Sequence, residues 1–84
     1  MNALNRDIEE GEEVVIKEAA MSEKHKDFKW RVFVVSGGFG ARAATSGTKV
    51  FGYYKEDGEQ SFIRGYDIDA HLTAIHQKKS RKVV

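Results

Sequence analysis

Residues 28–35 read FKWRVFVV, and this stretch decides the fold. Side chains two positions apart lie on the same face of a β-strand. The alternation therefore gives two apolar groups on opposite faces, with Phe28, Trp30, Val32 and Val34 on one and Arg31, Phe33 and Val35 on the other. Because both faces are largely apolar, we expect a strand over residues 28–35 at the centre of a sheet rather than at its edge.

Shorter elements flank this strand. The β-branched run within residues 12–17 predicts a first strand. Residues 18–27 are polar in their second half, and both a helical turn and a long polar excursion fit them. After the central strand, residues 36–40 are rich in glycine and residues 41–48 are small and polar, which indicates a loop.

A hairpin follows, with strands at residues 49–55 and 60–65. A two-residue turn would place Glu56 opposite Glu59, and like charges in direct opposition repel each other. We therefore expect a three-residue loop over residues 56–58, with Gly58 in the left-handed conformation. This register pairs Lys55 with Glu59 and Phe51 with Ile63, and it sets Gly52 across from Phe62.

The last expected element is a helix over residues 67–77. Asp67 is a suitable N-cap, and Asp69 suits the first turn, where the helix dipole favours negative charge. The spacing of Ile68, Leu72 and Ile75 forms a narrow apolar stripe on such a helix.

These elements predict one domain over residues 1–84, with a core at about 11–77, an acidic N-terminal segment at 1–10 and a basic C-terminal tail at 78–84. The expected fold class is mainly β (α+β). It is a small curled antiparallel sheet or an SH3-like, partly open barrel of four or five strands with a short C-terminal helix. A flatter sheet backed by the helix is the alternative.

Composition excludes several classes of site. The 84 residues include no Pro and no Cys. Because Cys is absent, disulfides, thiolate zinc sites and cysteine nucleophiles are excluded. No apolar run approaches the roughly 18 residues of a membrane span, and the first residues lack the apolar core of a secretory signal. We therefore expect a cytoplasmic protein without membrane contact.

The net charge of +1 is unevenly distributed. Residues 1–27 contain four basic and eight acidic residues, whereas residues 28–84 contain ten basic and five acidic residues. This polarity suits head-to-tail contacts. A chain this short also buries a small core, so a homodimer is compatible with the sequence because association buries additional surface.

We expect no metal, no cofactor and no enzymatic activity. His71 and His76 are five positions apart on the helix and do not share a face, while Asp67 and His71 supply too few ligands for a protein-held metal. No Ser or Thr lies in a G-x-S-x-G turn. The carboxylates of Glu12 and Glu13 are interpreted as part of a solvated acidic face.

The glycine-rich loop is the first candidate for a binding site. It follows a strand, as phosphate-binding loops do, but it lacks the G-x-x-x-x-G-K-[ST] spacing. We expect a protein-binding surface at Phe39 in this loop, at Arg42 beside it and at Tyr54, taken as the exposed aromatic residue of the hairpin. The expected function is that of a small non-enzymatic binding or adaptor protein with a protein partner.

Nucleic-acid binding by a small barrel is the alternative function. Aromatic side chains interleave with basic ones along the strands, and small barrels use this mixture to stack on bases and to contact phosphates. The candidate phosphate contacts are Arg31, Arg64, Lys78, Lys79, Arg81 and Lys82.

Five short motifs resemble those of small uncharacterised proteins carried by bacteriophages and related mobile elements. They are GEEVVI at 11–16, RVFVV at 31–35, GFG at 38–40, TSGTKVFG at 45–52 and GYDI at 65–68. The resemblance covers roughly residues 11–70. It implies a compact, SH3-like β fold and a phage-type setting, and it implies no catalytic residues.

Overall fold

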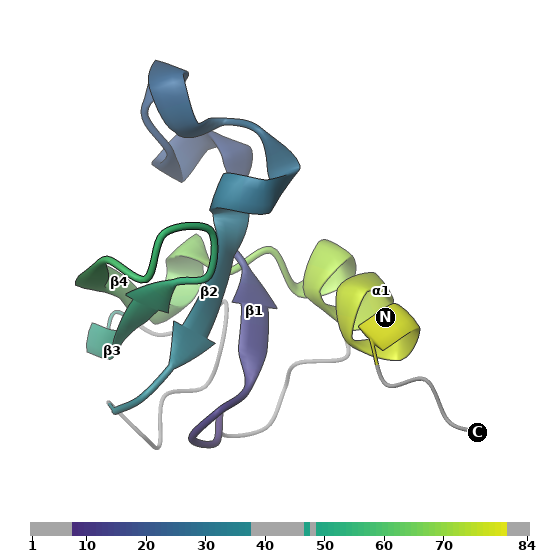
Figure 1. Ribbon diagram of the computed structural model, residues 1–84. Coiled ribbons are helices and arrows are strands. Elements are labelled where there is room, and N and C mark those ends of the chain that lie inside the picture. Colours follow the sequence, from purple (N-terminus) through teal and green to yellow (C-terminus); the bar gives the residue numbers. More distant parts are fainter. Residues whose placement is uncertain (1–7, 38–46, 48, 81–84) are drawn as a thin grey trace.

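The computed structural model describes residues 8–37, 47 and 49–80, which form an antiparallel sheet and one α-helix (Figure 1). The strands are β1 (Glu13–Val15), β2 (Val32–Val35), β3 (Lys49–Tyr54) and β4 (Gln60–Arg64), and the helix is α1 (Ala70–Ser80). The sheet order is β1-β2-β3-β4. The expected mainly β, α+β fold with a C-terminal helix is confirmed, and so is the internal position of the central strand.

The strand predicted over residues 28–35 is half as long as expected, because Phe28–Arg31 forms a 3-10 turn. The Trp30 N–H donates to the Asp27 carbonyl (2.9 Å), which closes this turn. Arg31 then fixes the entry into β2, since its Nε donates to the carbonyl of Ile16 (3.0 Å) and its own carbonyl accepts the Ile16 N–H (2.8 Å). The alternation of apolar side chains therefore extends into Phe28–Arg31, which precedes the paired strand β2 and is not part of it.

The segment between β1 and β2 combines both structures that the sequence allowed. It is a polar excursion made of single 3-10 turns at Glu18–Ala20, Glu23–His25 and Phe28–Arg31. In Figure 1 it rises above one end of the sheet. None of these turns contains a buried residue, which agrees with the absence of an apolar face there.

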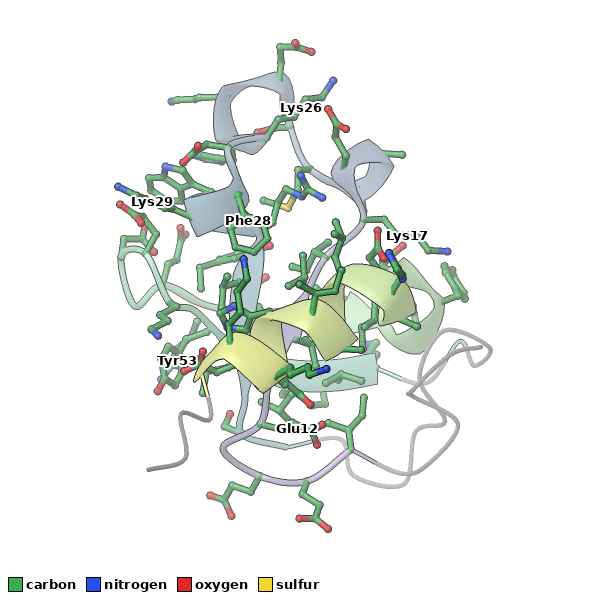
Figure 2. The ribbon with its side chains drawn as sticks, turned by 90° about the vertical axis from the view of Figure 1, so that its right-hand side faces the viewer. Glu12, Lys17, Lys26, Phe28, Lys29 and Tyr53 are labelled. Atoms are coloured by element: carbon green, nitrogen blue, oxygen red, sulfur yellow. The ribbon has the colours of Figure 1, made fainter. Side chains whose placement is uncertain are left out.

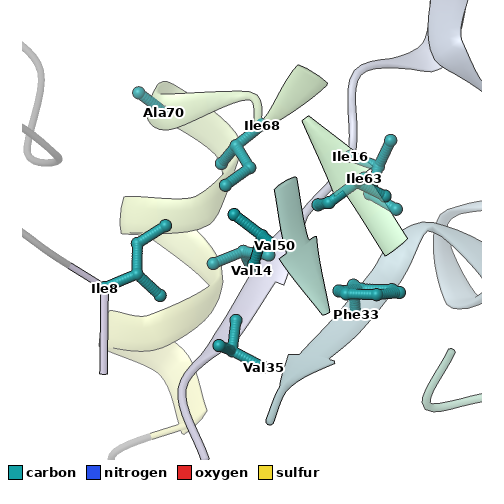
Figure 3. Close-up of a cluster of buried hydrophobic side chains, with 9 residues drawn as sticks. All are labelled: Ile8, Val14, Ile16, Phe33, Val35, Val50, Ile63, Ile68 and Ala70. Atoms are coloured by element: carbon teal, nitrogen blue, oxygen red, sulfur yellow. The ribbon is translucent and has the colours of Figure 1, made fainter. Parts of the chain in front are cut away.

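The core lies on one face of the sheet and is completed by residues from outside the strands (Figure 3). Val14, Phe33, Val35 and Val50 are at most 1% exposed. Ile8 before β1 and Ile68 and Ala70 around the start of α1 cover this face. The whole cluster consists of Ile8, Val14, Ile16, Phe33, Val35, Val50, Ile63, Ile68 and Ala70. Ile8 lies in the acidic N-terminal segment and is nonetheless fully buried.

Gly52 allows the ring of Phe33 to lie against β3. A Cβ atom at Gly52 would lie 2.0 Å from the Val34 carbonyl oxygen and 2.8 Å from Cε2 of Phe33. No side chain fits there without a backbone shift. The contact therefore fixes the position of β3 against β2, where Val35 is the partner of Gly52.

The predicted hairpin register is wrong by one residue. Phe51 is paired with Phe62 and Gly52 with Ser61, and the loop contains four residues, 55–58. Gly58 has a φ of +75°, as expected, and its N–H donates to the Tyr54 carbonyl (2.7 Å). The Asp57 carboxylate accepts the Glu59 N–H (2.9 Å) and stabilises the longer loop.

The expected cross-strand pairing of Lys55 with Glu59 does not occur, because Tyr54 lies opposite Glu59. Lys55 Nζ lies 3.2 Å from a carboxylate oxygen of Glu13 on β1 instead of pairing with Glu59. The two-residue turn is absent, as the like charges of Glu56 and Glu59 predict, and the carboxylate partner of Lys55 comes from a strand distant in the sequence.

Helix α1 begins three residues later than predicted. Asp69 is its cap, because its carboxylate accepts the Leu72 N–H (2.9 Å). Asp67 belongs to the preceding 3-10 turn, Gly65–Asp67. The predicted apolar stripe does not form the buried side, since Ile75 is 39% exposed while Thr73 is fully buried.

Helix α1 uses polar groups to cover the outer edge of β1, which it flanks in Figure 1. The hydroxyl of Thr73 accepts the Val15 N–H (2.8 Å), and the Gln77 amide donates to the Glu13 carbonyl (2.8 Å). The Asp69 N–H donates to the Val15 carbonyl (2.7 Å). These bonds satisfy edge groups that another strand would otherwise bind.

Thr73→Val should destabilise the protein by about 1–3 kcal/mol, because it leaves the buried Val15 N–H without an acceptor. Thr73→Ser keeps the hydroxyl and should cost only about 1 kcal/mol for the lost methyl group. Urea unfolding followed by circular dichroism compares the two variants. A valine variant as stable as the wild type would contradict the proposed closure of this edge.

Gly52→Ala should destabilise the protein by about 1–3 kcal/mol or more, since the added carbon overlaps the β2 backbone. Gly37→Ala is the matched control, because its Cβ would make only an ordinary 3.5 Å contact with Phe51. Urea unfolding of both variants tests the difference. Equal stability of the two would show that β3 is not held against β2 as described.

Candidate functional site

The face of the β3–β4 hairpin that points away from the core is rich in aromatic and basic side chains. We define this outer face as Lys49, Phe51, Tyr53, Gln60, Phe62 and Arg64, which are direct cross-strand partners in three pairs. Phe51 and Phe62 are each 46% exposed and Tyr53 is 38% exposed. The described part of the chain thus presents three large rings to solvent on two adjacent strands.

The aromatic centre of the outer face is bordered by cations. The ring centroids of Phe51 and Phe62 are 6.0 Å apart with an interplanar angle of 57°. Lys49 Nζ lies 4.9 Å and Arg64 Cζ lies 5.9 Å from the centroid of Phe62. Arg64 is also held in place by a hydrogen bond from Nη1 to the Gly47 carbonyl (3.0 Å).

The strand register explains why these aromatic residues are outside. The inward positions of β3 are Val50, Gly52 and Tyr54, and Gly52 has to face Phe33. Moving β3 by one residue would exchange its two faces. Phe51 is therefore held outward by the same contact that orders the core.

Tyr54 is not the exposed aromatic residue of the hairpin. Its ring packs edge-on against Phe33, with centroids 5.2 Å apart, and it is partly buried against the core. Its neighbour Tyr53 is the exposed one. The other two predicted protein contacts, Phe39 and Arg42, lie outside the described residues.

The predicted phosphate contacts do not form one surface in the described residues. Arg31 is partly buried and bonds to the Ile16 carbonyl, whereas Arg64 belongs to the outer face. Lys78 and Lys79 are exposed near the end of α1, which packs on β1 at the opposite edge of the sheet from β4. Arg81 and Lys82 lie outside the described residues.

Sequence reasoning missed Lys49, Phe51, Tyr53, Gln60 and Phe62 as members of one surface. The signal was present as two alternating runs, Lys49-x-Phe51-x-Tyr53 and Gln60-x-Phe62-x-Arg64. The register error concealed it, because pairing Phe51 with Ile63 places the two phenylalanine rings on different faces.

A small pocket lies between the polar excursion and the hairpin. Its volume is about 170 Å³, and its lining includes Met21, His25, Trp30, Tyr54 and Glu59. The rings of His25 and Trp30 are stacked at a tilt, with centroids 4.4 Å apart. Sites for organic cofactors usually measure about 300–1,000 Å³, so this pocket suits a single side chain.

Glu13 joins three elements and is not a freely solvated carboxylate. One of its oxygens lies 2.8 Å from His76 Nε2 on α1, and the other lies 3.2 Å from Lys55 Nζ. Partial burial raises the pKa of Glu13, but hydrogen bonds and charges from His76 and Lys55 outweigh burial and lower it overall. Its neighbour Glu12 is also engaged, by the Gln77 amide (3.0 Å). In Figure 2, Glu12 lies beneath α1.

Glu13→Gln should reduce stability at neutral pH by up to about 1 kcal/mol. A lowered carboxyl pKa stabilises the folded state above the unfolded pKa, and this contribution is lost as the pH falls through the folded value. The difference between wild type and variant should therefore shrink as the pH falls below about 4.

Urea unfolding at several pH values measures this difference. Glu10→Gln, at an exposed position nearby, is the control and should change stability by less than about 0.5 kcal/mol. A Glu13→Gln deficit that stays constant down to about pH 3 would contradict the role of the carboxylate charge.

Within residues 8–37, 47 and 49–80, no group of three His, Cys, Asp or Glu residues is placed to hold a metal ion. The described part of the chain also has no helix long and apolar enough to cross a bilayer.

Comparisons with protein-family models, with curated proteins and with solved structures found no match for this chain.

Proposed function

We propose that this chain is a non-enzymatic binding module that docks on a protein partner through the outer face. The observation that supports this function is the exposure of Phe51, Tyr53 and Phe62 side by side on two paired strands. Contiguous exposed aromatic groups are typical of interaction surfaces. Protein interfaces likewise combine an aromatic centre with a polar rim that contains arginine.

The arrangement of the outer face favours binding in two ways. Its side chains stand on hydrogen-bonded strands, so little conformational freedom is lost when a partner is bound. Lys49 and Arg64 are its only charged residues, so an acidic rim on the partner would be complementary.

The finer architecture that we propose is an SH3-like, partly open barrel. Support comes from the bridge between Ile16 and Ile68, which brings the chain after β4 beside β1. The Lys17 N–H donates to the Asp67 carbonyl (2.8 Å) at the same place. We further propose a phage-type accessory protein that acts in the cytoplasm, and this proposal rests on the short motifs that resemble phage proteins.

A second candidate function is the binding of single-stranded nucleic acid. It is favoured by the absence of any carboxylate among the six residues of the outer face, where two cations flank aromatic rings. Exposed rings stack on bases of any sequence while basic side chains contact phosphates.

The double variant Phe51→Ser, Phe62→Ser should retain the fold and lose partner capture by about 30-fold or more, as expected for residues that dominate an interface. Affinity capture from nuclease-treated bacterial lysate, quantified by mass spectrometry, measures this loss. Phe28→Ser is the matched control, because Phe28 is equally exposed (44%) but lies on the polar excursion. Equal capture by wild type and double variant would refute the assignment of the outer face.

The nucleic-acid candidate is tested by fluorescence anisotropy with a labelled oligothymidylate at increasing salt. If it is correct, Lys49→Gln with Arg64→Gln should reduce the slope of log affinity against log salt by about 1.4. Deleting residues 78–84 separates the basic tail from the outer face. Absence of binding at low salt would eliminate this candidate and leave the protein partner.

A further inference from the structure

The two edges of the sheet are treated differently. The outer edge of β1 is covered by α1 and by the segment that contains Ile68. Strand β4 forms the other edge, and within the described residues its side away from β3 is paired with no strand or helix. Figure 1 shows β4 on the side of the sheet away from α1.

The hydrogen-bond pattern shows which backbone groups of β4 face this open edge. Phe51 and Lys55 donate toward β2, to the carbonyls of Gly37 (3.3 Å) and Val32 (2.9 Å), while Tyr54 donates toward β4. Neighbouring residues alternate, so the partners of Phe51 and Tyr53, which are Phe62 and Gln60, point their backbone groups away from β3. Within the described structure these groups of Gln60 and Phe62 have no backbone partner.

Some of the usual protections of an edge strand are absent from β4, whose one charged residue is Arg64 at its end. It contains no proline and no lysine, and its five residues, QSFIR, run without a break in pairing. Among the outward backbone groups of β4, the N–H of Arg64 is bonded within the described residues, to the carboxylate of Asp67 (3.4 Å). Such an edge is a template for the addition of another strand.

We propose that β4 pairs antiparallel with β4 of a second copy of this chain, about a two-fold axis at Phe62. Residue 62 is the midpoint of β4, so this register alone overlaps all five residues of both strands. It places Phe62 opposite Phe62 and Gln60 opposite Arg64. The Phe62 pair exchanges two backbone hydrogen bonds, and each Gln60 N–H donates to the carbonyl of the opposite Arg64.

Charge supports the two-fold arrangement. The turn end of each hairpin carries Glu56, Asp57 and Glu59, whereas the opposite end carries Lys49 and Arg64. Antiparallel pairing of β4 with its copy brings the acidic end of one hairpin beside the basic end of the other. Both ends are then complementary, as an isologous interface requires.

The dimer goes beyond the proposed function, because it uses the edge of β4 and leaves the outer face free. It would join two four-stranded sheets into one and two outer faces into one surface. The aromatic pair of Phe62 and its copy would lie at the centre of this surface, flanked by Phe51 of each chain.

Disulfide trapping tests the register directly, since the chain has no native cysteine. Directly opposed residues have Cα atoms about 5.5 Å apart, within the range of a disulfide, whereas residue 60 would lie about 14 Å from its own copy. An equimolar mixture of Gln60→Cys and Arg64→Cys should therefore cross-link about tenfold faster than either variant alone.

Two results would overturn the proposal. One is a mixture that cross-links no faster than the single variants, with folding of both verified by circular dichroism. The other is sedimentation equilibrium of the unmodified chain that gives a monomer up to millimolar concentration.

Gln60→Pro removes an edge N–H at the first residue of β4, where proline is tolerated, and should shift a dimer to monomer without unfolding it. Loss of outer-face capture in the Phe51, Phe62 variant is a separate measurement, so the two proposals can fail independently.

Discussion

The contact between Gly52 of β3 and the ring of Phe33 on β2 is the constraint on which the rest of the structure depends. No Cβ fits at Gly52 without a backbone shift, so the position of β3 that faces Phe33 needs a glycine, and Gly52 is the only glycine of β3. This directs the face of β3 that contains Gly52 toward the core. That face is completed by Val50 and Tyr54. The aromatic residues at alternate positions are consequently held in solvent, and the core and the candidate binding surface have the same origin.

The second organising feature is the asymmetry between the two edges of the sheet. Helix α1 covers the outer edge of β1 with polar groups. The hydroxyl of Thr73 and the amide of Gln77 are both hydrogen-bonded to the backbone of this strand. Strand β4 has no such cover in the described residues. A small domain buries limited surface on its own, and an uncovered edge next to exposed rings is where association would bury more.

Local patterns predicted much of the fold. The internal position of β2, the order of the elements and the left-handed Gly58 follow from period-two hydrophobicity and turn chemistry, which act over a few residues. The hairpin register could not be predicted, because it depends on the packing of Gly52 against Phe33, which is distant in sequence. The helix cap at Asp69 and the buried Thr73 were missed for the same reason, since both are set by the β1 edge. The sequence also did not distinguish Tyr54 from Tyr53, and the exposed aromatic residues of the hairpin are Phe51, Tyr53 and Phe62.

The strand register turns Phe51 and Phe62 outward as direct cross-strand partners. Their pair is not hydrogen-bonded to each other, so their Cα atoms should be only about 4.5 Å apart. A nuclear Overhauser spectrum of the unmodified chain tests this most directly. A strong cross-peak between the α-protons of Phe51 and Phe62 is the predicted result. A cross-peak that pairs Phe51 with Ile63 instead would contradict the register and the outer face together.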